Sequence, residues 1–311
     1  MRNRLFVFAL SLAVSGCSSA PVIPPVFDGA RAYGYLTAQV DFGPRVPGTD
    51  AWRQCRSYYY AHFASLGLEV DSQAFAFYDP YSHADVPLVN VIARFRGGSE
   101  NEPALLIGAH WDTRPRTDFH SDTSRTGEPI QGANDGASGV AVLMELANIL
   151  AQRSPGINID LVLFDGEDWG EAGDLDYYML GSKHFARQKI RGRYRFGIVI
   201  DLIGDRDQQI YREAHSEQFY RPLNDMLWRE AAALGLATFR DSVKYSVMDD
   251  HLPLSTGGVP TVLLIDFDYP AWHTAHDTPD KCSPESLANV GRLLAHVIYN
   301  RELWPKNPSQ L

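Results

Sequence analysis

The sequence predicts an α/β protein, a three-layer α/β/α globule with a mixed, mainly parallel central sheet. Short, continuously apolar runs alternate with segments of helical periodicity along the 311 residues. Strands that are apolar throughout are buried on both faces, which is typical of parallel sheets covered by helices. The 45% hydrophobic content supports a full core, and no internal repeat or second change in composition divides the chain.

The first residues are typical of an export signal. Two arginines precede an apolar stretch, residues 5–14, which is too short to span a membrane. The stretch ends in VSGC (residues 14–17), and small residues directly before a cysteine resemble the lipobox of bacterial lipoproteins. The alternative is an ordinary signal peptide with an incidental cysteine.

We therefore expect residues 1–16 to be a lipoprotein signal peptide and Cys17 to carry a lipid. Residues 17–27 contain three prolines and are expected to form an extended tether to a single domain, residues 28–311. Ser18 follows the cysteine, and by resemblance to lipoprotein sorting in Gram-negative bacteria this residue favours the outer membrane, facing the periplasm.

The net charge of the chain limits the partners it can bind, and its cysteines bear on the compartment in which it folds. The formal net charge is −10, with no evident basic run, which argues against a nucleic-acid partner. A monomer is favoured, although the oligomeric state is open. Cys55 and Cys282 could form a disulfide in an oxidising compartment or remain buried free thiols, and the sequence does not decide between these.

The expected elements follow from apolar periodicity. Trp52, Tyr59, Phe63 and Leu66 form the stripe of an amphipathic helix. A second helix is expected at residues 139–150, and a last one from Ser283, with proline in its first turn, to about residue 303. Strands are expected at residues 88–95, 104–109, 159–164, 196–202, 209–212 and 261–265.

Polar motifs follow these strands where each strand ends. HWD begins at residue 110, GANDGASG at 132, FDGED at 164, DLIG at 201 and WH at 272. In a parallel sheet these carboxyl ends are where ligands bind. Taken singly, His110 could be a core histidine, Asp135 a helix cap and Asp201 a turn residue. Together they form a His/carboxylate set that suits Zn²⁺, because unpaired buried carboxylates would be very costly.

Glu167 and Asp168 are adjacent acids directly after an apolar strand. Neighbouring residues in extended backbone point to opposite sides, so the two need not share one environment.

The motifs HWD, GANDGASGV, FDGED, DLIG, DDHLP and WHTAHDT occur in the order and spacing of the zinc aminopeptidase-like metallohydrolases. Within that group the chain most resembles the glutaminyl cyclases, especially bacterial relatives of the animal enzyme, over roughly residues 35–300. The resemblance implies the α/β/α fold and one zinc ion. It also implies conversion of N-terminal Gln or Glu of peptides to pyroglutamate, with release of ammonia or water.

The resemblance also implies roles for single residues. Asp135, Asp168 and His273 match the zinc ligands, and Glu167 matches the general acid/base. Asp201 matches an acid near the substrate amine. One of Asp249 and Asp250 matches a further catalytic aspartate. Trp169, Tyr269 and Trp272 are expected to wall the substrate pocket, and residues 171–178 to form its rim.

Two other functions compete with this one. In the aminopeptidase relatives, residues matching His110 and Asp201 bind a second metal with Asp135 as the bridge, so a two-zinc aminopeptidase is the alternative. A binding lipoprotein on an inactive hydrolase scaffold is disfavoured, because the matched ligands and the matched base are all present.

Overall fold

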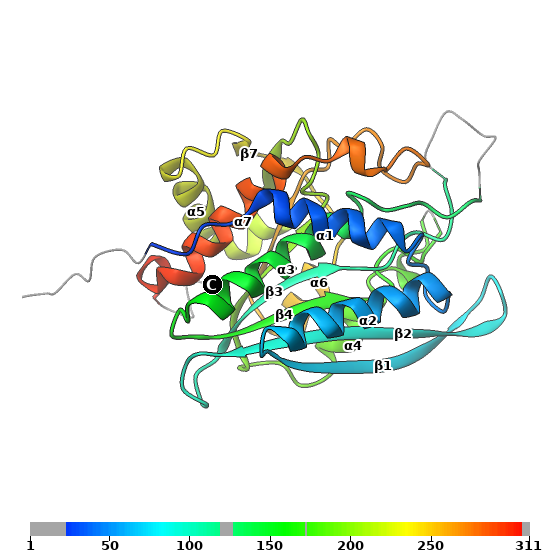
Figure 1. Cartoon of the computed structure of the whole chain (residues 1–311), viewed down its shortest axis with the longest axis horizontal. Coiled ribbons are helices and arrows are strands. Elements are labelled where there is room, and N and C mark those ends of the chain that lie inside the picture. Colours follow the sequence, from blue (N-terminus) through cyan, green and yellow to red (C-terminus); the bar gives the residue numbers. More distant parts are fainter. Residues whose placement is uncertain (1–22, 119–126, 172, 307–311) are drawn as a thin grey trace, which may run out of the picture.

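The computed structural model describes residues 23–118, 127–171 and 173–306 (Figure 1). The expected signal peptide and Cys17 lie outside these residues. Phe27, assigned to the tether, is buried in the main core, so the domain begins slightly earlier than expected. Across the described ranges, no helix combines the length and apolar character needed to cross a membrane.

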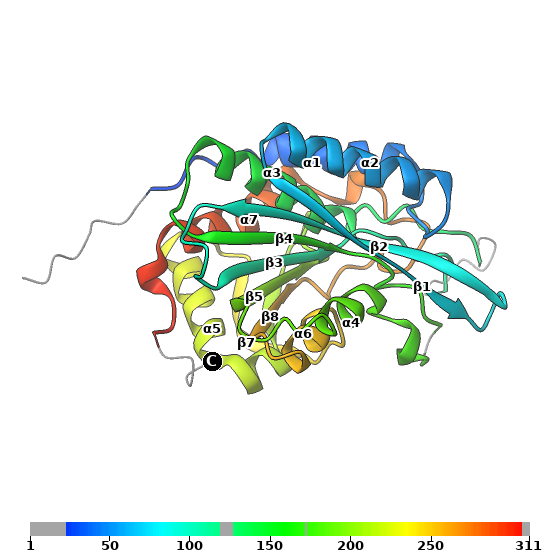
Figure 2. The same ribbon diagram turned by 90° about the horizontal axis from the view of Figure 1, so that it is seen from below.

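The central sheet has six strands in the order β1-β2-β4-β3-β5-β8 (Figure 2). β3 pairs in parallel with β4 and β5, and β5 with β8, while β2 runs antiparallel to β1 and β4. This arrangement confirms the mixed, mainly parallel sheet. The strands are β1 Glu69–Asp79, β2 Ala84–Arg96, β3 Ala104–His110, β4 Asn158–Phe164, β5 Tyr194–Asp201 and β8 Thr261–Ile265.

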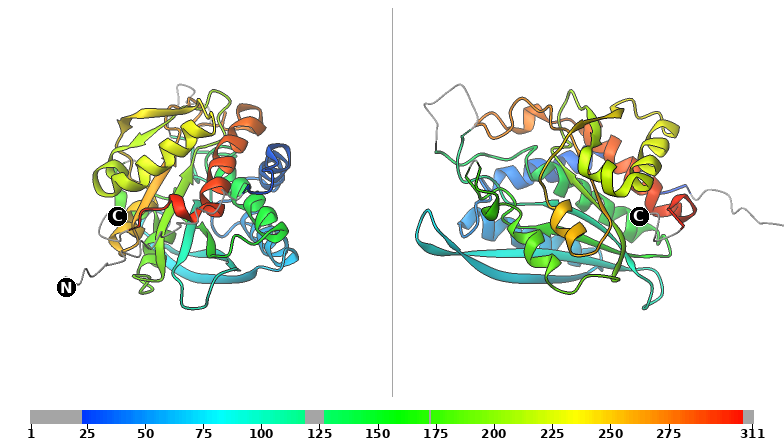
Figure 3. Two further views of the ribbon diagram at one scale, coloured as in Figure 1. Left: turned by 90° about the vertical axis from the view of Figure 1, so that its left-hand side faces the viewer. Right: turned by 180° about the vertical axis from the view of Figure 1, so that it is seen from behind.

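Helices cover both faces of the sheet, which gives the three layers seen end-on in Figure 3. One layer contains α1 Gly29–Asp41, α2 Asp50–Ser65, α3 Ala137–Gln152 and α7 Pro284–Tyr299. The opposite layer contains α4 Leu180–Ala186 and α6 His251–Thr256. α5 Ala214–Ala233 packs along β8 beside a second, parallel sheet of β6 Ile210–Glu213 and β7 Phe239–Tyr245. Short 3₁₀ turns occupy Leu175–Tyr177, Pro279–Lys281 and Arg301–Leu303.

Elements with weak apolar periodicity were missed by the sequence analysis. β1 and β7 have mostly exposed or half-exposed side chains and so lack a continuous apolar run. α5 contains Pro222 and a non-helical residue, Tyr220, which interrupt its pattern. α1 and the short α4 and α6 were also not predicted. The last helix ends at Tyr299 and continues only as the 3₁₀ turn, and the strand expected at residues 209–212 belongs to the second sheet.

The two cysteines of the domain are buried free thiols, which decides between the two alternatives. The Cys55 thiol donates to the Tyr59 hydroxyl at 3.0 Å, and burial raises the pKa of Cys55 to about 11. Both cysteines therefore act as small core residues.

Candidate active site

One cavity of about 420 Å³ is lined by residues that follow the carboxyl ends of β3 and β4 and by Asp201 and Ile265, the last residues of β5 and β8. The loops after these strands bring side chains far apart in sequence to this edge of the sheet. The predicted residues that line the cavity are Asp135, Glu167, Asp168, Asp201, Asp249, Trp272 and His273.

The turn after β4 is held by carboxylates beneath it. The Asp112 carboxylate accepts the backbone N–H groups of Glu167 (3.1 Å) and Asp168 (3.2 Å). Asp165 Oδ2 accepts from the backbone N–H of Val89 and from the Trp52 indole. These bonds fix the backbone of the adjacent acids, so their side chains emerge in defined directions. Neither Asp112 nor Asp165 is predicted from the sequence to have a role.

Asp135, Asp168 and His273 converge in a first cluster. His273 Nε2 lies 3.2 Å from Asp168 Oδ1 and 3.8 Å from Asp135 Oδ2, and one ligand atom from each residue lies within 4.8 Å of the others. Asp135 Oδ2 and Asp168 Oδ2 are buried without a hydrogen-bond partner. Because unpartnered buried carboxylate oxygens are costly, a cation fits here, and one imidazole with two carboxylates suits zinc.

A second cluster shares Asp135 with the first. His110 Nε2 lies 3.1 Å from Asp135 Oδ1 and 3.1 Å from Asp201 Oδ1. Burial lowers the pKa of His110, but the surrounding carboxylates of Asp201, Asp112 and Asp135 outweigh it and raise the pKa well above its usual value. The same geometry can therefore hold a second cation, or a protonated imidazole that donates to the carboxylates.

Unusual backbone conformations place the ligands. Gly136, directly after Asp135, has φ 94°, and a Cβ there would lie 2.7 Å from the Asp112 carbonyl oxygen, so only glycine fits. His273 has φ 55°, a left-handed conformation that is uncommon for non-glycine residues and concentrates at functional sites. The backbone N–H of Asp135 donates to Asp277 at 3.1 Å. The loop that carries Asp277 and the segment just before α3 are therefore tied together.

A buried arginine supports the first cluster from outside. Arg114 Nη1 donates to Asp168 Oδ1 at 2.7 Å, and Arg114 Nε donates to Asp118 Oδ1 at 2.9 Å. Asp118 Oδ1 also lies 3.6 Å from His273 Nδ1, the nitrogen that faces away from Asp168. A carboxylate behind a metal-binding histidine orients the ring and raises its basicity. We did not predict Arg114 or Asp118; their only sequence signal was proximity to HWD.

Burial and neighbouring charges shift the pKa values of the two adjacent acids, Glu167 and Asp168, in opposite directions. Burial disfavours ionisation of Asp168, but His273 and Arg114 outweigh it and lower the pKa of Asp168 to about 2. Burial raises the pKa of Glu167 well above its usual value, and the nearby Asp249 and Asp168 charges add to this, against the effect of His110. Asp168 is therefore poised as an anion and Glu167 as a proton carrier.

Asp249 and Asp250 differ in their access to the cavity. Asp249 lines it, whereas Asp250 is fully buried outside the lining. Burial raises the pKa of Asp249 well above the usual range, with Asp201 and Asp250 adding to it, and burial raises the pKa of Asp250 to about 7. Of the two aspartates that the sequence left open, the one able to reach a ligand in this cavity is Asp249.

Only one of the three expected aromatic walls lines the cavity. Trp272 does, and its ring stacks on His273 with 3.8 Å between the centroids. Trp169 instead packs beside Val86, and its indole donates to Asp79. Tyr269 is buried with its hydroxyl donating to Asp277. The expectation for these two rings is corrected, because proximity in sequence does not set the direction of a side chain. Apolar walls come instead from Leu175, Val247, Met248, Ile265 and Phe267.

Comparisons with known proteins identify a family and several relatives of this chain. The model of peptidase family M28 matches residues 90–298. The glutaminyl-peptide cyclotransferase-like protein of Bos taurus is 26% identical over 284 residues, covering 81% of this chain and 70% of its own length. The Bacteroides thetaiotaomicron glutaminyl cyclase bound to N-acetylhistamine is 34% identical with a TM-score of 0.84, covering 89% of this chain and 99% of its own.

A third relative carries the name of the alternative function. The structure of a leucine aminopeptidase precursor from Bacteroides thetaiotaomicron is 34% identical to this chain with a TM-score of 0.85, covering 90% of this chain and 99% of its own. The family model alone spans well over half of the sequence. The chain belongs to peptidase family M28, with bacterial glutaminyl cyclases among its relatives.

Proposed function

We propose that the protein is a zinc-dependent glutaminyl-peptide cyclotransferase, which converts N-terminal Gln (or Glu) of peptides and proteins to pyroglutamate. The observation that carries this proposal is Glu167, a carboxylate with a raised pKa that lines the cavity beside the Asp135–Asp168–His273 cluster. The similarity to proteins named as glutaminyl cyclases supports it.

We assign one zinc ion to Asp135, Asp168 and His273, whose unpartnered carboxylate oxygens and imidazole match its preferred donors. When bound, zinc supplies a Lewis acid that polarises the substrate carbonyl. Arg114 and Asp118 keep the ligands oriented.

The reaction moves one proton within the substrate. The α-amine nitrogen forms a bond to the γ-carbonyl carbon, the bond from that carbon to the amide nitrogen breaks, and ammonia leaves. A proton must pass from the attacking amine to the departing nitrogen, and Glu167 can accept and return it. The acids Asp201 and Asp249 line the same cavity and suit hydrogen bonding to the substrate α-amine. Trp272 and Phe267 supply apolar wall for the side chain.

The two-metal aminopeptidase is the second candidate, favoured by the His110–Asp135–Asp201 cluster. In that enzyme His110 would be a metal ligand, whereas in a one-zinc cyclase its Nε2–H donates to Asp201 Oδ1, with Asp135 Oδ1 also 3.1 Å from the same nitrogen. The two functions therefore predict different metal contents for the same geometry.

One assay distinguishes them. Purified protein is incubated separately with an H-Gln-peptide and with Leu-p-nitroanilide, while ammonia and nitroaniline are followed. We expect ammonia and pyroglutamyl peptide, with close to one zinc per chain. Nitroaniline without ammonia, together with close to two zinc per chain, would establish the aminopeptidase instead.

We further propose that residues 1–16 are a signal peptide and that a lipid on Cys17 anchors the enzyme to the outer membrane, facing the periplasm. Membrane fractionation of a Cys17→Ala variant tests this, with the membranes washed at high salt so that electrostatic contacts are screened and only lipid anchoring is measured. We expect the variant to move to the soluble fraction, and an unchanged membrane fraction would contradict lipid anchoring.

A further inference from the structure

The connection between α4 and β5 concentrates positive charge in an acidic protein. The connection and its flanking elements, residues 179–200, contain six Lys and Arg and no Asp or Glu, whereas the whole chain carries a net charge of −10. This segment is a basic run, contrary to the expectation from the sequence that the chain has none.

The charges of this connection are exposed and uncompensated. Arg187, Lys189, Arg191 and Arg193 are all exposed, and none of them forms an ion pair with an acid of the described ranges. Other cations at this end of the molecule differ, since Arg96, for example, pairs with the buried Asp160 at 2.7 Å. The four side chains therefore present free positive charge to solvent.

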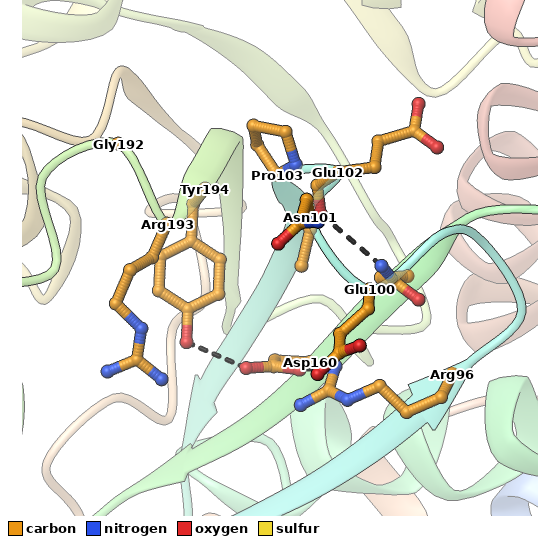
Figure 4. A pocket seen from close by; sticks show the side chains of 11 residues that line it. Arg96, Glu100, Asn101, Glu102, Pro103, Asp160, Gly192, Arg193 and Tyr194 are labelled. Atoms are coloured by element: carbon orange, nitrogen blue, oxygen red, sulfur yellow. Dashed lines mark hydrogen bonds and ion pairs between the residues drawn. The ribbon is translucent and has the colours of Figure 1, made fainter.

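The connection lies at the amino ends of the central strands, opposite the active site. Arg193 immediately precedes β5, and its carbonyl accepts the backbone N–H of Ala104, the first residue of β3. Figure 4 shows Arg193 beside the Tyr194–Asp160 hydrogen bond, at a cavity of about 280 Å³. Glu100 and Glu102 also line this cavity, and Glu102 is paired with Arg301.

The first described residues lie at the same end of the molecule. Arg153, which follows α3 and precedes β4, donates from Nη1 to the Ile23 carbonyl at 2.6 Å. Ile23 and Val26 are 80% and 88% exposed. Exposed apolar side chains together with exposed cations favour the interface of an anionic bilayer, where the cations meet headgroups and the apolar groups meet the acyl boundary.

We propose that this basic end, defined by Arg153, Arg187, Lys189, Arg191 and Arg193, binds anionic phospholipid headgroups. The active-site cavity lies at the opposite end of the strands, so this contact turns the cavity away from the membrane. Peptide substrates then reach the cavity from the aqueous side. The proposal does not depend on which reaction the cavity catalyses.

Vesicle sedimentation tests the proposal with the full chain in a Cys17→Ala background, which removes the lipid attachment site. Vesicles of phosphatidylcholine alone are compared with vesicles that also contain phosphatidylglycerol, at low and high salt. We expect tighter binding to the anionic vesicles, weakened by salt because exposed charges are screened. We expect Lys189→Glu/Arg191→Glu/Arg193→Glu to weaken that binding at least about tenfold, and the corresponding Gln variant to be intermediate.

A matched control reverses three exposed cations elsewhere, as Arg53→Glu/Arg206→Glu/Lys281→Glu, with the same change in net charge. Binding that is equal on both vesicle types, or equally weakened in control and test variants, overturns the proposal. Tighter binding of an anionic oligonucleotide through the same cations overturns it in favour of a nucleic-acid surface. Turnover of a soluble Gln peptide should be unchanged in every variant, which separates this test from that of the enzymatic function.

Discussion

Buried aspartates at the two ends of β4 differ in how fully their carboxylate oxygens are hydrogen-bonded. Near its amino end, Asp160 accepts a hydrogen bond from the Tyr194 hydroxyl at 2.7 Å and one from Arg96 Nη1 at 2.7 Å. Just past its carboxyl end, Asp168 is as deeply buried, yet its Oδ2 has no hydrogen-bond partner. Asp135 in the neighbouring loop also leaves one oxygen unpartnered.

The difference shows which acids serve the fold and which await a ligand. A buried carboxylate is tolerated when its charge is compensated. At the amino end the protein supplies the cation and the donors itself, so that site is closed. At the carboxyl end the compensation is incomplete, and a metal ion can complete it.

The largest effect is expected for Glu167→Gln, which removes the proton carrier near the carboxyl end of β4. Turnover of an H-Gln-peptide should fall by about 10²–10⁴-fold, because the amide cannot shuttle a proton. Zinc content, measured by atomic emission, should stay at the wild-type level. Loss of the metal in this variant would mean that the roles of Glu167 and Asp168 are exchanged.

The contrast between the two ends of β4 is tested by replacing the aspartate with asparagine at each end in turn. Asp168→Asn should lower zinc affinity by more than about 100-fold, since loss of a direct ligand exceeds the ~10–100-fold typical of outer partners. Asp160→Asn should leave zinc affinity unchanged and lower the free energy of unfolding by about 1–3 kcal/mol. Chelator competition and urea unfolding measure the two quantities. Equal zinc affinities in the two variants would refute the contrast.

Arg114 should act as a positioning residue for the metal cluster. Arg114→Met removes the donor to Asp168 Oδ1, and we expect zinc affinity to fall by about 10–100-fold. Arg96→Met is the matched control, because it breaks the corresponding pair with Asp160 at the closed end. It should leave zinc affinity unchanged. A wild-type affinity in Arg114→Met would show that the arginine only fills space.

Glu213 extends the comparison to a third, fully partnered acid. Burial opposes its ionisation, but His251 and backbone N–H groups outweigh this and lower the pKa of Glu213 to about 2. A pKa below the unfolded value of 4.5 stabilises the fold above pH 4.5, and this stabilisation is lost as the pH falls toward 2.

Glu213→Gln should therefore lower the free energy of unfolding at pH 7 by no more than about 2 kcal/mol, because the amide keeps part of the hydrogen bonding. The difference from wild type should shrink as the pH is lowered below 4.5. Urea unfolding at several pH values measures it, and a difference independent of pH would exclude the linkage.

Much of the architecture could be predicted because its strands are buried along their length. β3, β4 and β8 are wholly buried and appear as continuous apolar runs, so the polar motifs after the strands could be assigned to one edge of the sheet. β1 was missed because its side chains are largely exposed, and α5 because Pro222 breaks its periodicity. Apolar periodicity in a sequence reflects which side chains are buried. β1 and α5 show little of this periodicity, so it could not predict them.

The sequence by itself determined that the acids and histidines lie at the carboxyl ends of the strands, because parallel strands bring those ends together. Only the tertiary structure decided that Asp249, not Asp250, lines the cavity and that Trp169 and Tyr269 do not. It also brought Arg114 onto Asp168 and set four exposed cations at the opposite end. Side-chain direction and contacts between distant segments depend on packing in three dimensions, which one-dimensional periodicity does not record.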